Sequence, residues 1–277
     1  AASDVYKRQV MNMNLGAMHN TAGDVGSYGL LYQWGRKDPF PAAPTLTGTT
    51  ATVGAPIYDG DDNEIKITNS SQSSTADNNL AFAIANPTVC LSNYAQFNTS
   101  RDWLQADMSN DALWGNPKGA ERNETNDFLN KGAKSFYDPC PVGWRVPPAD
   151  VFRNFTASGG YAWVIDDFDI ADISGDGAKS LADYDYGWTF NLSDSASSYF
   201  PAAARFDGSY AMLMGSMSGL WGSYWGNAPY PGDMFQGGAY SVLSFQIKDT
   251  AGNEMITTSP AGGGARADAY SVRCIRE

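Results

Sequence analysis

The distribution of apolar residues predicts short strands near both ends of the chain. Apolar residues alternate with asparagine along Val10–Leu15, and Gly29–Phe40 is rich in aromatic residues and closes on Asp-Pro. Alternation with a period of about two places apolar side chains on one face of a strand. We therefore expect a short strand at Val10–Leu15 and a strand or turn at Gly29–Phe40. The last clear strands are expected at Ser241–Lys248 and Tyr270–Ile275.

Helical signals are few in this sequence. Asn123–Lys131 and Pro148–Phe155 are predicted as short helices, and the second begins at a proline, which is favourable in the first helical turn. After Gly159 the chain consists of short aromatic segments broken by Gly, Asp and Ser. Such segments are typical of a twisted antiparallel sheet with long loops. The pattern as a whole predicts an α+β fold with few short helices.

The composition between residue 41 and about residue 79 shifts to Pro, Thr, Gly, Ser, Asp and Asn, which indicates a surface insertion. Within this insertion, Ala55–Tyr58 and Glu64–Thr68 flank Asp59-Gly60, and this arrangement predicts a hairpin. We therefore interpret residues 10–277 as a single domain that carries an insertion at about 41–79.

The first nine residues do not fit this domain. Residues 1–9 (AASDVYKRQ) resemble sequence found at the truncated ends of metagenomic reading frames, and we interpret them as a non-native or truncated start. On this interpretation an export signal and other domains of a longer parent protein are expected upstream. No apolar run approaches the roughly 18–20 residues of a membrane-spanning helix, so no transmembrane segment is expected.

Charge and composition narrow the class of protein. The formal net charge of −12 argues against nucleic acid and anionic membranes as partners, because both attract a basic surface. Disorder over most of the chain is excluded by 8 Trp, 15 Tyr and 13 Phe, since disordered chains are poor in aromatic residues. Charged residues make up only 17%, while Ser, Thr, Asn and Gly abound, as in a loop-rich extracellular protein.

Several kinds of catalytic site are disfavoured by the residues available. The single imidazole, His19, lies in a Gly- and Asn-rich stretch far from any cysteine, so we interpret it as a structural or loop residue. The three cysteines are widely spaced and offer neither a zinc-binding pair nor a reactive pair. Gly262-Gly263-Gly264 lacks the context of a phosphate-binding loop. A carboxylate pair for glycoside hydrolysis stays open, but no spacing among the 30 acidic residues selects one.

One acidic segment has the spacing of a calcium loop. Oxygen ligands at the relevant loop positions would be Asp172, Ser174, Asp176 and Asp183, with Gly177 at the sharp turn. However, a lysine stands where such loops carry an apolar residue, and the last ligand is Asp rather than the longer Glu. We favour an ordinary acidic turn, and calcium is the only cofactor that the sequence suggests.

Aromatic and polar residues are concentrated in the segment after Gly219. Flat rings with amide and carboxylate neighbours are what a saccharide-binding face uses, because rings stack on the apolar faces of sugars. The same rings could instead fill the core between the sheet and the helices, and for most of them we favour this core interpretation. The candidate ligand-binding residues are Trp221, Tyr224, Trp225, Asn227, Tyr230 and Asp233.

Several motifs occur together in a characteristic order: Gly29–Arg36, Leu113–Gly115, Tyr137–Pro147 (YDPCPVGWRVP), Tyr199–Ala203 and Ser271–Cys274. This order resembles the Fibrobacter succinogenes major paralogous domain, which occurs in surface lipoproteins and fimbrillin-associated proteins of Bacteroidetes. The resemblance covers roughly residues 11–277, and DPCPVGWRVP is its most specific part. It implies a fold similar to C-type lectins and to the formylglycine-generating-enzyme domain.

The resemblance also implies particular residue roles. In those folds a strand containing Gly-Trp-Arg leads into a helix, and a terminal Arg-Cys strand pairs back near the start of the domain. It therefore implies a Cys140–Cys274 disulfide with Cys90 free. Arg145 and Arg273 each sit between apolar neighbours in a strand-like segment, so we expect both to be scaffold residues that bond carboxylates or backbone carbonyls inside the domain. The resemblance further implies that long loops, here between about residues 215 and 238, carry ligand contacts. The triplets that bind calcium and sugar in calcium-dependent C-type lectins are missing from this sequence.

Three functions are consistent with these features. The first is a non-catalytic, cell-surface or secreted domain for adhesion or recognition, with a glycan or a host or pilus protein as partner and the fimbrial tip as one location. The second is a purely structural module of a surface assembly. The third is a secreted glycan-acting enzyme. All three place the protein outside the cytoplasm, either associated with the outer membrane or extracellular.

Overall fold

The computed structural model describes residues 9–48, 50, 53–70, 79–91, 102–104, 111–115, 132–210, 212–230, 238–247, 254–258 and 262–277. In this part of the chain the secondary structure is mostly β-strand, with one α-helix, α1 (Asn79–Ala85), and short 3-10 helices. The 3-10 helices are η1 (Val25–Ser27), η5 (Arg153–Phe155), η6 (Ile165–Asp167), η7 (Leu181–Asp183) and η8 (Gly215–Met217). The strands are β1 (Leu30–Gln33), β2 (Pro39–Pro41), β3 (Ile57–Tyr58), β4 (Glu64–Ile65), β5 (Thr68–Ser70), β6 (Val89–Leu91), β7 (Trp144–Arg145), β8 (Tyr161–Ala162), β9 (Gly187–Ser193), β10 (Ala196–Pro201), β11 (Phe206–Asp207), β12 (Met212–Leu213), β13 (Trp221–Tyr230), β14 (Gly238–Gln246), β15 (Met255–Thr258), β16 (Gly263–Ala265), β17 (Ala269–Ser271) and β18 (Ile275–Arg276).

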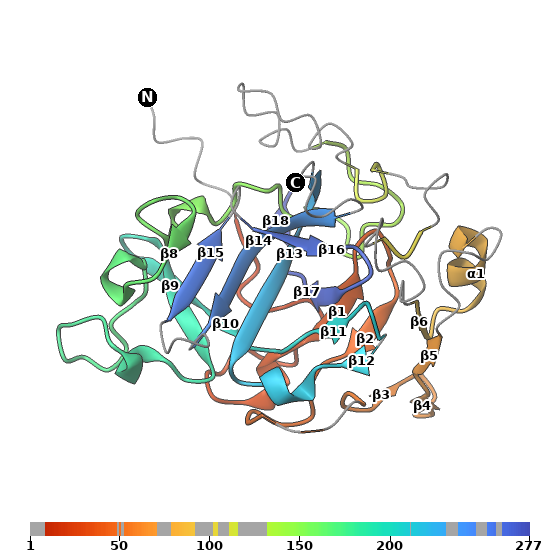
Figure 1. The fold of residues 1–277 in the computed structure, drawn as a ribbon, viewed down its shortest axis with the longest axis horizontal. Helices are drawn as coiled ribbons and strands as arrows, with labels where there is room; N and C mark the ends of the chain where they lie inside the picture. Colours follow the sequence, from red (N-terminus) through yellow and green to blue (C-terminus); the bar gives the residue numbers. More distant parts are fainter. Residues whose placement is uncertain are drawn as a thin grey trace.

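Ten of the described strands form one sheet. Its order is β12-β11-β17-β13-β14-β15-β8, with β1 and β2 continuing beside β17 and β16 pairing with β14. In Figure 1, β13, β14 and β15 run side by side through the middle of the molecule. The pairs are antiparallel except β13–β17, which is parallel. The sheet-rich α+β class expected from the sequence agrees with this architecture, since helices are few and short.

One face of the central strands is covered by the β9–β10 hairpin. Phe190 of β9 stacks on Phe155 with 4.2 Å between ring centroids, and Phe200 of β10 meets Tyr224 of β13 at 5.4 Å. Phe190 also lies 6.4 Å from the ring of Phe245 on β14. Buried rings remove large apolar areas from water, so this aromatic layer is a main source of stability. The opposite face of these strands carries the side chains of Ser223, Ser244 and Thr257.

The beginning and the end of the described chain are joined. Val10 forms an isolated bridge with Ile275, and β18 pairs with β7 of the Gly-Trp-Arg motif. A disulfide connects Cys140 to Cys274 with 6.0 Å between the α-carbons, while Cys90 is a buried free thiol. The cysteine pairing implied by the family resemblance is therefore confirmed.

Both motif arginines are scaffold residues, as expected. The Arg273 side chain is completely buried, and its Nη2 donates to the carbonyl of Tyr199 at 2.7 Å. Its Nε donates to Asn14 Oδ1 at 3.0 Å, and its guanidinium lies 4.1 Å from the Phe200 ring centroid. Arg145 is also buried, and its Nη1 donates to the carbonyl of Gly132 at 2.9 Å.

Two elements predicted in or near the insertion are present in the structure. The hairpin expected around Asp59-Gly60 is β3–β4, with Asp59 Oδ1 accepting the backbone N–H groups of Asp61 and Asn63. The aromatic segment after Gly29 forms the antiparallel pair β1–β2. The predicted helix Asn123–Lys131 lies outside the described residues.

Three local predictions are wrong. Val10–Leu15 is an irregular segment rather than a strand, because Asn14 turns inward to bond the Tyr28 carbonyl and Arg273. Pro148–Phe155 forms tight turns that end in η5, instead of an α-helix. Such i→i+3 turns align side chains three residues apart, and Phe152 accordingly stacks on Phe155 at 4.9 Å. The expected strand Tyr270–Ile275 is split between β17 and β18, because the chain leaves the large sheet to pair with β7.

None of the helices in the described ranges has the length and apolar character needed to cross a bilayer.

Candidate functional site

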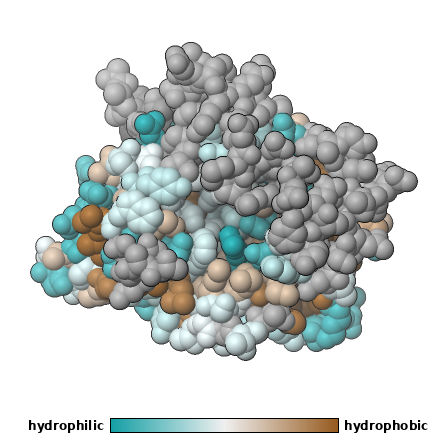
Figure 2. Space-filling model, in the orientation of Figure 1, coloured by the Kyte–Doolittle hydropathy of each residue, from teal (hydrophilic) through white to brown (hydrophobic). Residues whose placement is uncertain are grey.

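One face of the large sheet contains a groove of about 220 Å³, which we call the sheet-face groove. Ser223 and Thr257, which line it, are only 3% and 4% exposed. Figures 1 and 2 show the molecule from the same side, with β13, β14 and β15 in front. The surface in Figure 2 is hollowed near the middle. The groove is lined by Tyr161, Arg205, Trp221, Ser223, Ser241, Ser244, Met255, Thr257, Gly262, Gly263 and Tyr270.

Strand register builds a row of hydroxyl groups across the groove. Ser223 of β13 stands opposite Ser244 of β14, Ser244 opposite Thr257 of β15, and Thr257 opposite Tyr161 of β8. Directly opposed residues project from the same face of a sheet, so the four hydroxyl-bearing side chains form one line. The Ser223 and Ser244 Oγ atoms lie 3.3 Å apart, and Trp221 Nε1 donates to Ser244 Oγ at 3.1 Å.

Aromatic rings stand at both ends of this row. At the β8 end, Tyr161 is 50% exposed and Trp163 is 48% exposed. Their ring planes are parallel within 3°, with 6.1 Å between centroids. At the β13 end lies the half-buried ring of Trp221, and Arg205 stacks over it at 4.7 Å. A line of hydroxyl groups between flat apolar rings is complementary to a pyranose, which has apolar faces and a polar rim.

The charge of Arg205 is compensated within the protein. Its guanidinium lies 3.7 Å from Asp207 Oδ2 and 3.8 Å from Asp268 Oδ2. Burial alone would lower the pKa of Arg205, but Tyr270, Asp268 and Asp207 outweigh it, and the pKa is raised. Burial raises the pKa of Asp268, against the opposing effects of Arg205 and the Gly208 N–H. Arg205 therefore stays cationic beside one or two carboxylates.

Half of the ligand-binding residues expected from the sequence belong to the core. The segment expected to be a long loop contains β13, the strand between β14 and β17, and it buries Tyr224, Trp225 and Asn227 completely. Trp225 stacks on Tyr270 at 4.1 Å, and its Nε1 donates to the Tyr32 carbonyl at 2.7 Å. These three residues cannot contact a ligand at the surface, because neighbouring strands and core side chains enclose them.

The remaining three candidates have different outcomes. Trp221 is half-buried and lines the sheet-face groove. Tyr230 is half-buried and packs edge-on against Tyr240 at 5.1 Å, outside the groove lining. Asp233 lies outside the described residues.

The proposed calcium ligands point to backbone groups instead of a common centre. Asp183 Oδ1 accepts the N–H groups of Ile173 and Ser174, and its Oδ2 accepts that of Ser180. Asp172 accepts hydrogen bonds from the Ser174 hydroxyl and from the backbone N–H groups of Gly175 and Gly177. Asp176 accepts one from the Ala178 N–H. In the described part of the chain no group of three or more His, Cys, Asp or Glu residues could hold a metal ion. These bonds to backbone N–H groups stabilise the turn.

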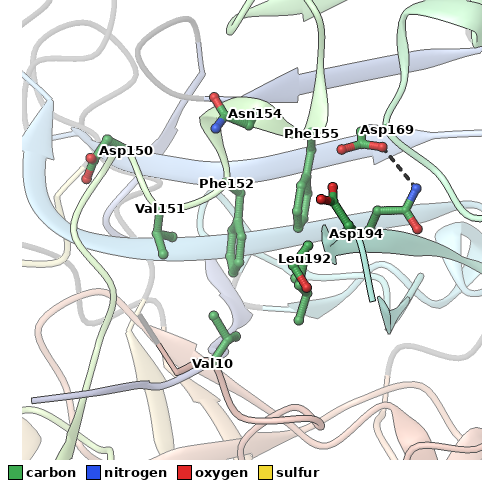
Figure 3. A pocket seen from close by; sticks show the side chains of 11 residues that line it. Val10, Asp150, Val151, Phe152, Asn154, Phe155, Asp169, Leu192 and Asp194 are labelled. Atoms are coloured by element: carbon green, nitrogen blue, oxygen red, sulfur yellow. Dashed lines mark hydrogen bonds between the residues drawn. The ribbon is translucent and has the colours of Figure 1, made fainter. Parts of the chain in front are cut away.

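A larger cavity of about 380 Å³ lies near the β9–β10 hairpin (Figure 3). Phe152 and Phe155 contribute rings to its wall, and three carboxylates border it. Figure 3 shows Asp150 at the opposite end of the cavity from Asp169 and Asp194. Asp169 accepts a hydrogen bond of 2.9 Å from Asn191 Nδ2, and this bond ties its carboxylate to β9.

Sequence reasoning missed Tyr161, which lines the groove, and Trp163, which stacks beside it. A local signal was present, because Tyr-Ala-Trp after Gly159-Gly160 puts two aromatic residues at alternate positions and hence on one side of an extended chain. The hydroxyl row has no such signal, since serine and threonine are common throughout the chain. The glycine triplet has a packing role: a Cβ at Gly264 would lie 2.6 Å from Tyr270 Oη and 2.9 Å from the Trp225 ring.

No protein-family model matches this chain, and neither a curated protein nor a solved structure does. Its function therefore has to be argued from the geometry of the site.

Proposed function

We propose that this protein is a non-catalytic recognition domain that binds glycans in the sheet-face groove. The observation that carries this proposal is the line of hydroxyl groups on Ser223, Ser244, Thr257 and Tyr161, which ends in aromatic rings on both sides. Ligand sites combine apolar and aromatic walls with a few convergent polar groups. Rings that stack on a sugar contribute about 1 kcal/mol each, so we expect weak affinity per site that increases when several copies act together.

The chemistry of the groove favours binding over catalysis. General acid–base catalysis uses a group whose pKa lies near the working pH, most often an imidazole or a carboxylic acid. The side chains that line the groove in the described ranges include no carboxylate, imidazole or thiol. The serine and threonine hydroxyls of the row have no base among the lining residues that could activate them.

The proposed location is the cell surface or the extracellular medium, and the proposed fold is a variant of the C-type-lectin-like fold. The Cys140–Cys274 disulfide supports export, because disulfides persist mainly in oxidising compartments. The pairing of β18 with β7 and the Val10–Ile275 bridge support the lectin-like proposal, since that fold brings its terminal strand back to the start of the domain.

An array of neutral and acidic oligosaccharides, followed by titration calorimetry on the hits, tests the proposal. We expect Trp221→Ala and Tyr161→Ala each to weaken binding about fivefold, the equivalent of about 1 kcal/mol. Tyr58→Ala is the matched control, because Tyr58 is 58% exposed on β3 and lies outside the groove. We expect this control to bind like the wild type.

Each other result points to one of the alternatives. An absence of binding to every saccharide tested would overturn the proposal in favour of a structural module. Release of shorter saccharides, abolished by Asp169→Asn or Asp194→Asn, would instead support a glycan-acting enzyme that uses the larger cavity.

A further inference from the structure

We infer that the sheet-face groove selects uncharged glycans and rejects those that carry carboxylate or sulfate groups, an inference that rests on glycan binding at this groove. The determinant is the triad formed by Arg205, Asp207 and Asp268. In this triad the two carboxylates form ion pairs with the guanidinium group with which an anionic sugar would otherwise pair.

Arg205 is the only charged side chain that lines the groove in the described part of the chain. Taken alone, an arginine at a sugar-binding surface would suggest an acidic ligand, because its planar fork pairs well with carboxylates and sulfates. The geometry here argues otherwise. Asp207 and Asp268 lie 3.7 Å and 3.8 Å from the two terminal nitrogens, and the Trp221 ring covers one face of the guanidinium.

The two carboxylates are held in place independently of Arg205. Asp207 Oδ1 accepts the Ser209 N–H at 2.9 Å. Asp268 Oδ1 accepts the Gly208 N–H at 2.7 Å, and its Oδ2 accepts the Tyr270 hydroxyl at 2.8 Å. An incoming anion therefore cannot displace them by a simple side-chain rotation. It would have to approach Arg205 beside carboxylates that already pair with it.

The net charge of the triad is zero if Asp268 is protonated and −1 if it is ionised. Neither state attracts an anion, and the net charge of −12 on the whole chain adds a repulsive field. The remaining contacts that the groove offers are hydroxyl groups and aromatic rings. These groups are complementary to the hydroxyl rim and the apolar face of a neutral pyranose.

Calorimetry with matched oligosaccharides tests this selectivity on the full chain. The neutral probes are cellohexaose, mannohexaose and xylohexaose, and the anionic probes are hexagalacturonate and hexamannuronate. We expect the best neutral probe to bind at least tenfold more tightly than either anionic probe at about 0.1 M salt, where charges further away than about 10 Å are largely screened.

Asp207→Asn removes one carboxylate of the triad and retains the oxygen that accepts the Ser209 N–H. We expect this variant to bind hexagalacturonate at least threefold more tightly than the wild type does, with unchanged affinity for the neutral probe. Asp61→Asn is the control for net charge, because Asp61 is exposed in the β3–β4 turn. It should leave both affinities unchanged, and thermal unfolding verifies that both variants are folded.

The outcomes separate the two proposals. Tighter binding of an anionic probe than of every neutral probe, or an Asp207→Asn variant with unaltered affinity for hexagalacturonate, would overturn the selectivity and leave glycan binding intact. Failure of all five probes, together with a blank array, would overturn glycan binding itself.

Discussion

At the scale of single residues, the core contains an unusual set of buried polar groups around Arg273. The Tyr224 hydroxyl donates to the Pro201 carbonyl at 2.8 Å and accepts from Asn14 Nδ2, while Arg273 bonds carbonyls and a serine hydroxyl of the surrounding strands. Buried polar groups are tolerated when hydrogen bonds satisfy them. Their ionisation, however, differs between the folded and the unfolded chain, and stability must therefore depend on pH.

We expect the protein to lose stability between pH 10 and 12. Burial raises the pKa of Tyr28 and of Tyr224 from 10.0 to about 12. The native state keeps both protons in this window whereas the unfolded chain releases them, so stability present below pH 10 is lost as the pH rises through 12. Burial lowers the pKa of Arg273 to about 10, which has the opposite effect. Burial also raises the pKa values of Tyr32, Tyr184, Tyr199 and Tyr270.

More tyrosines are raised than arginines are lowered, so the net effect in this window is a loss of stability as the pH rises. Urea unfolding at several pH values measures this loss. The Tyr28→Phe/Tyr224→Phe double variant, which cannot ionise at these sites, should show a shallower decline. A free energy of unfolding that is constant to pH 12 would contradict the prediction.

At the scale of elements, local hydrogen bonds decide what the acidic segment does. Ser180 and Asp183 form a reciprocal capping box at η7, and the same carboxylate reaches back to Ile173 and Ser174. Burial acts to raise the pKa of Asp183, but these backbone N–H bonds prevail and lower it. These three bonds hold the Asp183 carboxylate in the turn.

We expect Asp183→Asn to destabilise the protein by about 1–3 kcal/mol, because one of its oxygens becomes an amide that faces a backbone N–H. Asp176→Asn should have little effect, since Asp176 is exposed and accepts a single bond. Urea unfolding compares the two variants. Adding millimolar calcium and then removing it with EDTA should leave the wild-type unfolding midpoint unchanged. A calcium-dependent rise that Asp183→Asn abolishes would restore the calcium interpretation.

At the scale of the whole molecule, the disulfide joins the middle of the chain to its end. Cys140 and Cys274 are separated by 134 positions, and β7, β18 and the Val10–Ile275 bridge meet in the same region. A cross-link over so long a loop removes much of the entropy of the unfolded chain. The closure of the domain therefore depends on this bond as well as on the core.

We expect reduction of the disulfide to lower the free energy of unfolding by as much as roughly 4–5 kcal/mol. Urea unfolding with and without dithiothreitol measures the loss. The Cys140→Ser/Cys274→Ser variant should match the reduced wild type and show no response to the reductant. If the wild-type midpoint does not change on verified reduction of the bond, the prediction is wrong.

Local signals in the sequence determined the strand-rich class, the β3–β4 hairpin, and the motif that contains Cys140 and Arg145. Turn chemistry and the alternation of side chains act between residues close in the chain, so a sequence expresses them directly. The local sequence did not determine the structure of Pro148–Phe155. Its composition is that of a helix start, but the segment forms turns in which Phe152 packs on Phe155.

Only the tertiary structure decided which rings are buried and where a ligand could bind. Tyr224 and Trp225 have the composition of a binding loop but lie in a strand between two neighbours, and long-range pairing places them there. The hydroxyl row joins Tyr161, Ser223, Ser244 and Thr257 from four strands. Its existence depends on strand register, and a shift of one residue would turn these side chains to the opposite face. Register is a property of the assembled sheet, which is why no single segment of this sequence reveals the groove.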